Sequence, residues 1–209
     1  MKRRAVLEVV AGFSHSQHGL FTRAQVNVAG VTDGDLERLR DDIERIAYGV
    51  WRFRWSPPSN REGIAAALLA VEPTVALWEH AAGGSLAVSY LSAAALLGFG
   101  NLPARRHELT TSTGRRTRRA DIHLHHAPLP EVDLTTVDVL PVTTPMRTLT
   151  DIIMGRRADP PHMGDMVADA IAKEVVDPSE LDLRLVAVGA PYTVAELLAD
   201  AGRSNVLAA

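Results

Sequence analysis

Two consecutive prolines, Pro57 and Pro58, constrain the fold of this chain more than any other feature of its sequence. Small polar residues flank them, and neither a helix nor a central strand continues through such a stretch. We therefore expect residues 55–60 to form a linker. It divides the 209 residues into a small head, residues 1–56, and a larger body, residues 60–209, and the length of the chain suits this division.

The first 56 residues predict three short helices followed by a β-hairpin. Thr22 and Thr32 can accept hydrogen bonds from the N–H groups of a helix N-terminus, so each predicts the start of a helix. This order of elements is typical of a winged helix-turn-helix, in which the second helix of the pair usually enters the major groove of DNA. The expected elements are a helix over 2–12, a helix over 23–29, a helix that starts at Thr32 or Asp33, and a hairpin over 43–53.

The body combines apolar helices with short strands, which predicts the α+β (or α/β) class: a winged-helix head and a larger mixed α/β C-terminal domain. Its strongest helix start is Thr144 before Pro145, a cap followed by a proline at the first helical position. We expect strands over 107–112 and 120–126 to form a hairpin around the basic turn 114–119. The other expected elements are helices over 62–71, 76–80, 87–97, 145–154, 161–176 and 194–201, a break at Gly83-Gly84, and a strand over 137–142.

The composition excludes several classes of protein. There is no cysteine, so disulfides and thiolate metal sites are excluded, and we expect a cytoplasmic protein. No apolar run is long enough to predict a membrane span, and no cleavage pattern predicts a secretory signal. The charge is uneven: residues 1–56 carry nine basic and seven acidic side chains, residues 100–126 six and two, and residues 158–209 three and nine. The acidic C-terminal quarter would be repelled by nucleic acid, unlike the other two regions.

Three segments of the sequence together resemble one family. They are residues 20–52 (LFTRAQ through AGV to IAYGVWR), residues 88–98 (VSYLSAAALLG) and residues 141–151 (PVTTPMRTLTD). In this order and spacing they resemble the AbiEi family of antitoxins, over about residues 15–155. The resemblance implies a type IV-like toxin–antitoxin system of the abortive-infection kind, whose toxin is an AbiEii-like nucleotidyltransferase. The short chain and its bias toward arginine and alanine match a mycobacterial-type member.

The resemblance implies a binding protein rather than an enzyme, with no catalytic residue, cofactor or metal of its own. Family members are described as repressing their operon through the winged helix and as needing the C-terminal part to neutralise the toxin. Neutralisation by a stable complex, by competition for the RNA target of the toxin, or by promoting its modification all stay open. The alternative is a stand-alone transcription regulator whose body senses a ligand or a partner. A neighbouring nucleotidyltransferase gene would separate the two.

The third predicted helix carries more acid than a groove-reading helix usually does. Asp33, Asp35 and Glu37 fall in its first turn and a half, where phosphates would repel them. DNA binding therefore depends on the basic side chains of the head, among which we expect Arg38 and Arg40 to matter most. A head that packs on the body or self-associates is the alternative. The candidate DNA contacts are Lys2, Arg3, Arg4, Arg23, Thr32, Arg38, Arg40, Arg45 and Arg52.

The densest charge in the chain is the basic turn that carries Arg115, Arg116, Arg118 and Arg119. Each guanidinium can bind a phosphate or a carboxylate through two hydrogen bonds. The turn therefore predicts a contact with DNA or with the toxin. A turn that is merely solvated is the alternative.

Three metal-capable side chains alternate along the strand predicted over 120–126. Asp121, His123 and His125 would share one face of it, and such a set suggests a metal-dependent nuclease as a third function. No Glu-x-Lys follows, and no second cluster of ligands is evident. A half-exposed strand that holds no metal is therefore the favoured interpretation.

Arg147 and Asp151 lie four residues apart on the helix predicted after Pro145. This spacing places them on one face, where they can form an ion pair. A catalytic role is conceivable, but a structural pair that ties the helix to a strand explains the spacing more simply.

Overall fold

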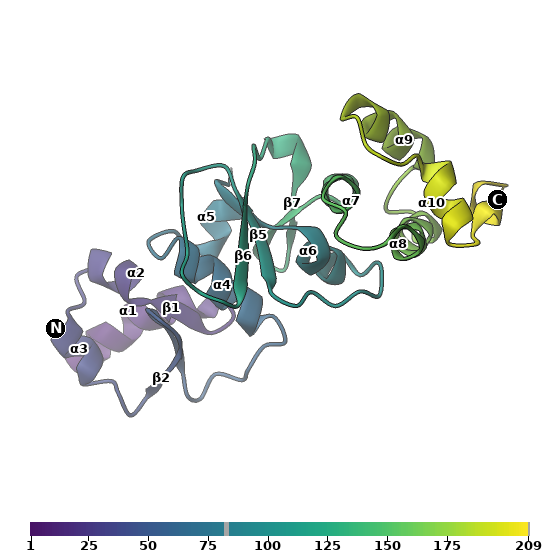
Figure 1. The fold of residues 1–209 in the computed structure, drawn as a ribbon. Helices are drawn as coiled ribbons and strands as arrows, with labels where there is room; N and C mark the ends of the chain where they lie inside the picture. Colours follow the sequence, from purple (N-terminus) through teal and green to yellow (C-terminus); the bar gives the residue numbers. More distant parts are fainter. Residues whose placement is uncertain (82–83, 209) are drawn as a thin grey trace.

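The computed structural model describes residues 1–81 and 84–208. Helices combine with a three-stranded and a five-stranded sheet, which makes the protein α+β. The head lies at one end of an elongated molecule, and helices from the last quarter of the chain lie at the other, with the five-stranded sheet between them (Figure 1). In the described residues, no helix has the length and apolar character that crossing a membrane requires.

Threonine caps start two helices of the head. The hydroxyl of Thr22 accepts the N–H of Gln25 at 3.0 Å while the Gln25 side chain accepts the N–H of Thr22 at 2.9 Å, and Thr32 forms the same box with Asp35. The predicted helices and hairpin are present, and one strand, β1, falls where a loop was expected. The elements are α1 (Arg3–His15), β1 (Leu20–Thr22), α2 (Arg23–Val28), α3 (Asp33–Glu37), β2 (Ile43–Ala47) and β3 (Val50–Phe53), with strand order β1-β3-β2.

The head packs firmly on the body. Leu20 and Val50 are fully buried in the core that the body builds around its own sheet. Beside them the buried side chains of Gln17 and Gln25 hydrogen-bond to each other at 3.0 and 3.1 Å, and the N–H of Leu77 donates to the Gln17 side chain at 3.0 Å. Because a buried amide that lost a partner would stay unsatisfied, this network fixes how the head lies on the body.

The body is built around the five-stranded sheet, whose order is β6-β5-β4-β8-β7. Helices α4 and α5 cover one face of it, and helices α6 and α7 cover the other (Figure 1). The predicted helices over 62–71 and 145–154 are confirmed at both ends. The elements are α4 (Glu62–Val71), α5 (Leu77–Ala81), β4 (Leu86–Val88), α6 (Tyr90–Leu97), β5 (His107–Thr111), β6 (Ile122–His126), η1 (Glu131–Asp133), β7 (Leu134–Val137), β8 (Leu140–Thr143) and α7 (Pro145–Met154).

The last quarter of the chain is helical and has its own core against α7. The helix predicted over 161–176 ends early, and Asp177, expected to mark its end, caps a further helix that the sequence did not predict. Its carboxylate accepts the N–H groups of Ser179 at 2.8 Å and Glu180 at 2.9 Å. The elements are α8 (Pro160–Ala172), α9 (Pro178–Ala187), α10 (Val194–Asp200) and η2 (Ser204–Ala208).

The predicted hairpin between residues 107 and 126 is wrong. Strands β5 and β6 pair in parallel, with His107 opposite Ile122 and Thr111 opposite His126. Strand β4 pairs with one edge of β5 in the antiparallel sense. Strand β6 pairs with the other edge, after residues 112–121 lead the chain back to the end of the sheet where β5 began. The basic turn is therefore part of a crossover rather than the tip of a hairpin.

Two other predicted elements divide differently. The helix expected over 87–97 starts only at Tyr90, because Leu86–Val88 form the central strand β4, buried on both faces. The strand expected over 137–142 is two antiparallel strands joined at Asp138 and Val139, whose φ angles are +49° and +62°. Such a turn usually contains Asn or Gly, and this one has neither, which is why the sequence did not reveal it. Of the predicted break at Gly83-Gly84, residue 83 lies outside the described residues.

Candidate functional site

Carboxylates neutralise most of the basic side chains that the head offers to DNA. Thr32 is likewise engaged, since its hydroxyl caps α3 and bonds to Asp35 at 2.6 Å. Arg45 differs: it lies over the ring of Tyr48, 5.1 Å from its centroid, at the exposed turn of the β2–β3 hairpin. Lys2 and Arg45 have no carboxylate within 4 Å in the described part of the chain. The ion pairs are Arg3–Asp42, Arg4–Glu8, Arg23–Asp33, Arg38–Asp35 and Arg40–Glu37.

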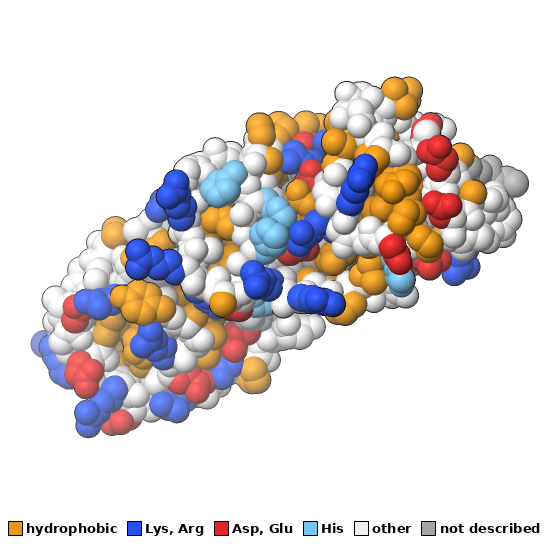
Figure 2. Space-filling view, viewed as in Figure 1, with side chains coloured by type: hydrophobic (Ala, Val, Ile, Leu, Met, Phe, Trp, Pro, Cys, Tyr) orange, Lys and Arg blue, Asp and Glu red, His pale blue; other side chains and the backbone are white. Residues whose placement is uncertain are grey.

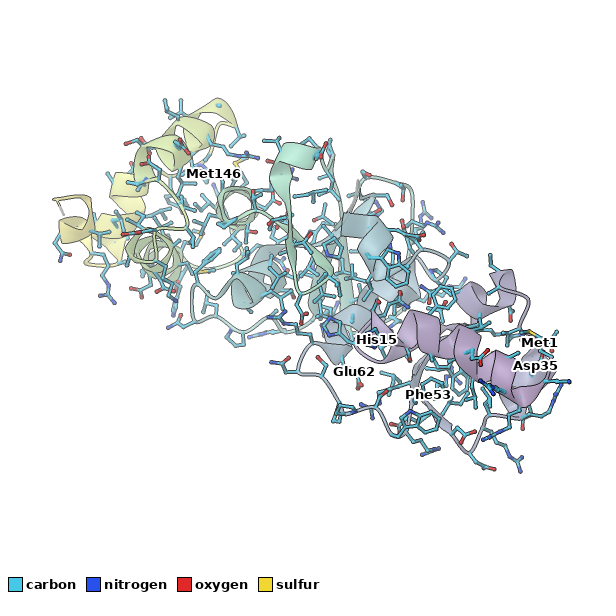
Figure 3. All side chains as sticks on the ribbon, turned by 180° about the vertical axis from the view of Figure 1, so that it is seen from behind. Met1, His15, Asp35, Phe53, Glu62 and Met146 are labelled. Carbon is cyan, nitrogen blue, oxygen red and sulfur yellow. The ribbon has the colours of Figure 1, made fainter. Side chains whose placement is uncertain are left out.

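Arg52 lies at the junction of head and body rather than on the surface expected of a DNA contact. Its side chain is 12 % exposed and pairs with Glu44 on the neighbouring strand and with Glu62 at the start of α4, the latter at 2.5 Å. Glu62 is labelled in Figure 3, where the body meets the head. The hydrogen bond to Glu44 raises the pKa of Arg52 above its ordinary value. Arg52 therefore ties the head to α4, and its guanidinium is not free to meet a phosphate.

The basic crossover offers two free arginines rather than four. Arg119 binds Asp121 through two nitrogens, at 2.9 and 2.5 Å, and Arg115 Nε lies 3.6 Å from a carboxylate oxygen of the buried Glu72. Arg116 and Arg118 are exposed, and within the described ranges neither has a carboxylate closer than 4 Å. A phosphate or acidic partner would therefore meet these two side chains.

The structure keeps two of the three metal-capable residues predicted on one strand together, and a different acid completes the group. Asp121 precedes β6 and is held by Arg119, which lowers the pKa of its carboxyl. Its place beside the histidines is taken by Glu108, which lies opposite His123 in the parallel register of β5 and β6. The rings of His123 and His125 stack with centroids 4.2 Å apart, and ligand atoms of these two and Glu108 lie within 4.8 Å of one another.

An arginine supplies positive charge to this cluster. Arg157, from the connection between α7 and α8, donates a hydrogen bond to Glu108 Oε1 at 2.5 Å. The same nitrogen lies 3.3 Å from His123 Nδ1. The guanidinium thus lies between the carboxylate and the imidazole, where a bound cation would have to displace it.

An open pocket of about 650 Å³ lies beside this cluster. The start of α6, the loop after it, the strands β5 and β6 and the α7–α8 connection line it. Figure 2 shows basic and histidine side chains close together over β6 and α6, on the face that Figure 1 presents. Four arginines line the pocket: Arg105, Arg106, Arg156 and Arg157.

Glu108 is a buried charge at the base of the pocket, 2 % exposed. Burial opposes its ionisation, but His125, the N–H of Leu91 at 2.9 Å and Arg157 together hold the pKa of Glu108 below its ordinary value. The carboxylate is therefore ionised at neutral pH. Burial, with the neighbouring His125 and Arg157, lowers the pKa of His123, which is therefore neutral there.

Arg156 in the pocket lining and Tyr90, which precedes Leu91 of that lining, have strained backbones. Tyr90 at the start of α6 has φ +51° and Arg156 has φ +46°, both in the left-handed region that costs a non-glycine residue about 1–2 kcal/mol. The ring of Tyr90 stacks on His125 with centroids 3.8 Å apart. Strain of this kind gathers at functional sites, where the surrounding structure enforces it.

The ion pair expected between Arg147 and Asp151 is present. Arg147 Nε lies 2.9 Å from both carboxylate oxygens of Asp151, and its Nη1 lies 2.7 Å from the buried Asp133, which also accepts a bond from Arg184 at 2.8 Å. Burial raises the pKa of Asp151, although Arg147 opposes this. The network ties α7 to η1 and α9.

Sequence reasoning singled out His123 but missed Glu108 and the arginines that line the pocket. Glu108 is one acid in a strand that is otherwise suited to burial, and such a residue is a signal of a buried ionic contact. The arginines occur as two adjacent pairs, at 105–106 and 156–157, each in a loop that follows a helix. Nothing local shows that these loops meet, since they are about 50 residues apart.

Comparison with known proteins identifies the fold alone. No protein-family model matches the chain, and no curated protein matches it. Among solved structures, the crystal structure of the RV2827C protein from Mycobacterium tuberculosis matches with a TM-score of 0.57 and 16 % sequence identity. The match covers 97 % of this chain and 79 % of that chain, so the shared fold includes both the head and the body.

Proposed function

We propose that this chain is an antitoxin of the AbiEi type, which neutralises a nucleotidyltransferase toxin by binding rather than by catalysis. The observation that carries the proposal is that the three segments resembling the AbiEi family come together in the fold. Leu20 of the first, Val88 of the second and Val142 of the third are buried in one core. Val88 and Val142 are also partners in the parallel pair β4–β8, and the helices that follow these strands, α6 and α7, pack on each other.

The second and third segments also lead to the pocket. Leu91 in the first turn of α6 lines the pocket, and α7 is followed directly by the segment that carries Arg156 and Arg157. The arginines of the pocket are exposed, and a neighbouring hollow that shares Arg106 with the pocket leads to the exposed Arg116. We therefore assign neutralisation to this face of the body.

The test is co-expression of the full chain with the nucleotidyltransferase encoded beside its gene. The proposal expects the toxin alone to stop growth and the chain to restore it. Toxicity that the chain does not relieve would refute the antitoxin function, whichever mechanism of neutralisation applies. This measurement does not depend on a stable complex.

Operator binding by the head is the second half of the proposal. The short helices and the hairpin of the head support a winged helix, whose wing tip would be the exposed Arg45 and Tyr48, with no carboxylate within 4 Å of Arg45 among the described residues. We expect Arg45→Gln to weaken binding to DNA from upstream of the gene and to reduce its salt dependence. Arg4→Gln is the matched control, because Arg4 is as exposed but pairs with Glu8. Wild-type affinity of Arg45→Gln would remove the wing from the interface, and equal weakening by Arg4→Gln would reduce the effect to general attraction by the basic head.

A stand-alone regulator is the alternative function, and the pocket favours it, because a regulator that senses a ligand needs a cavity in its body. The two functions differ in the co-expression test. A regulator binds its operator but leaves the growth arrest unchanged. An antitoxin restores growth, and it does so even as Arg45→Gln, in which operator contact is weakened.

A further inference from the structure

The pocket beside Glu108 holds more positive charge than its own carboxylates neutralise. Arg157 is engaged by Glu108, and the second carboxylate of the lining, Asp159, is bonded to the ring of His162. Three arginines of the lining have no carboxylate within 4 Å in the part of the chain that the structure describes: Arg105, Arg106 and Arg156.

Unneutralised guanidinium groups that face one hollow repel each other and attract an anion. The guanidinium fork matches the oxygens of a phosphate, to which it can donate two parallel hydrogen bonds. Arg156 adds a further sign of function, since it occupies a left-handed backbone position where glycine would be unstrained. The charge therefore favours a ligand with one or more phosphate groups.

The rest of the lining favours a nucleoside attached to those phosphates. Leu91, Leu102 and Pro103 add apolar surface to the same lining. The volume of about 650 Å³ lies within the range of about 300–1,000 Å³ that small-ligand pockets occupy. A flat base can lie on this apolar surface while the phosphates reach the arginines, so one molecule can use both parts of the lining.

A nucleic-acid strand would use a different surface. A shallower hollow adjoins the pocket, shares Arg106 and His123 with it, and leads to Arg116. A strand would continue through that hollow and contact Arg116, because successive phosphates need a track of charge. A single nucleotide would remain in the pocket, whose lining holds both the unneutralised arginines and the apolar side chains.

We propose that this pocket binds a free nucleotide, with its phosphates on Arg105, Arg106 and Arg156 and its base against Leu91 and Leu102. The proposal goes beyond the antitoxin function and does not depend on it. Arg157 holds the carboxylate of Glu108 away from the phosphates by pairing with it.

The test is titration of the purified full chain with a fluorescent ATP analogue at about 0.15 M salt. We expect saturable binding that unlabelled ATP displaces. The double variant Arg105→Gln, Arg106→Gln should weaken it by about tenfold or more, because it removes two charge-assisted contacts. The matched control is Arg116→Gln, Arg118→Gln, which removes the same charge from the neighbouring crossover and should change the affinity by less than about twofold.

Three results would overturn the proposal. One is the absence of saturable binding to the wild-type chain, whose fold a melting curve verifies. Another is an equal loss of nucleotide affinity in the two double variants, which would mean that any basic surface of the chain attracts the nucleotide. The last is a single-stranded RNA oligonucleotide that binds more tightly than ATP and loses affinity in the crossover variant, which would make the ligand a strand.

Discussion

Replacing Arg156 with glycine is expected to stabilise the folded protein and to weaken the binding of a nucleotide in the pocket. Arg156 follows Gly155, the C-cap of α7, with φ +46°, and its N–H bonds to the carbonyl of Ile153 at 3.2 Å. Helices commonly end with a glycine in this left-handed position, since a side chain there meets its own backbone. The strain costs a non-glycine residue about 1–2 kcal/mol.

The expected size of the effect follows from two opposing contributions. Glycine removes the strain but gives the unfolded chain more freedom, which costs about 0.4–1 kcal/mol. The net gain is about 0.5–1 kcal/mol, because the Arg156 side chain is exposed and makes no ion pair in the described part of the chain. In a chain of 209 residues this corresponds to an increase of about 1–4 °C in Tm.

Alanine at the same position is the matched control. Arg156→Ala removes the same guanidinium but keeps the left-handed strain, so its Tm should stay within about 1 °C of the wild type. Calorimetry of both variants measures the difference, and nucleotide titration of both should show the same loss of affinity. Equal melting temperatures would refute the strain argument. Unchanged affinity would remove Arg156 from the anion site.

Two further predictions concern stability. Gly164→Ala should lower the free energy of unfolding by about 2 kcal/mol or more, because a Cβ there would lie 2.0 Å from the carbonyl oxygen of Leu197 and push α8 from α10; Gly12→Ala, on an open helix face, should raise it by about 0.5–1 kcal/mol. Burial lowers the pKa of His80 and of His123, so the unfolded state binds protons more readily, and Tm should fall as pH drops below about 6.5. His80→Gln should make Tm fall less steeply with decreasing pH. An unchanged dependence of Tm on pH would contradict the contribution assigned to His80.

Local chemistry in the sequence predicted the helix starts well. Thr22, Thr32 and Thr144 each accept an N–H of the first helical turn, as their residue type and position indicated. Caps are readable because donor and acceptor lie within three residues of each other. The same holds for Arg147 and Asp151, which are one helical turn apart.

Contacts between distant segments were beyond the sequence pattern. Alternation along residues 120–126 correctly placed His123 and His125 together, but it supplied Asp121 as their acid where the structure supplies Glu108. The parallel register of β5 and β6, which places Glu108 opposite His123, decides this. Since each strand alone fits a parallel or an antiparallel partner, the register could not be inferred locally.

The same limit applies to the head. Arg52 was a candidate DNA contact because of its charge alone, whereas in the structure its guanidinium pairs with Glu62 of the body. A linker at residues 55–60 suggested two separate parts, but the packing of Leu20 and Val50 into the body core depends on contacts across that linker. The sequence identifies these charged and apolar side chains of the head, but only the tertiary structure shows that they pack against the body.

Growth under toxin expression tests the central claim most directly. Cells would carry the neighbouring nucleotidyltransferase under an inducible promoter, with this chain or an empty vector, and surviving colonies would be counted after induction. A catalytically inactive nucleotidyltransferase serves as the control for expression burden. The account predicts that the chain restores the colony count to that of the control. A count as low as that of the empty vector, with the chain present and folded, would contradict it.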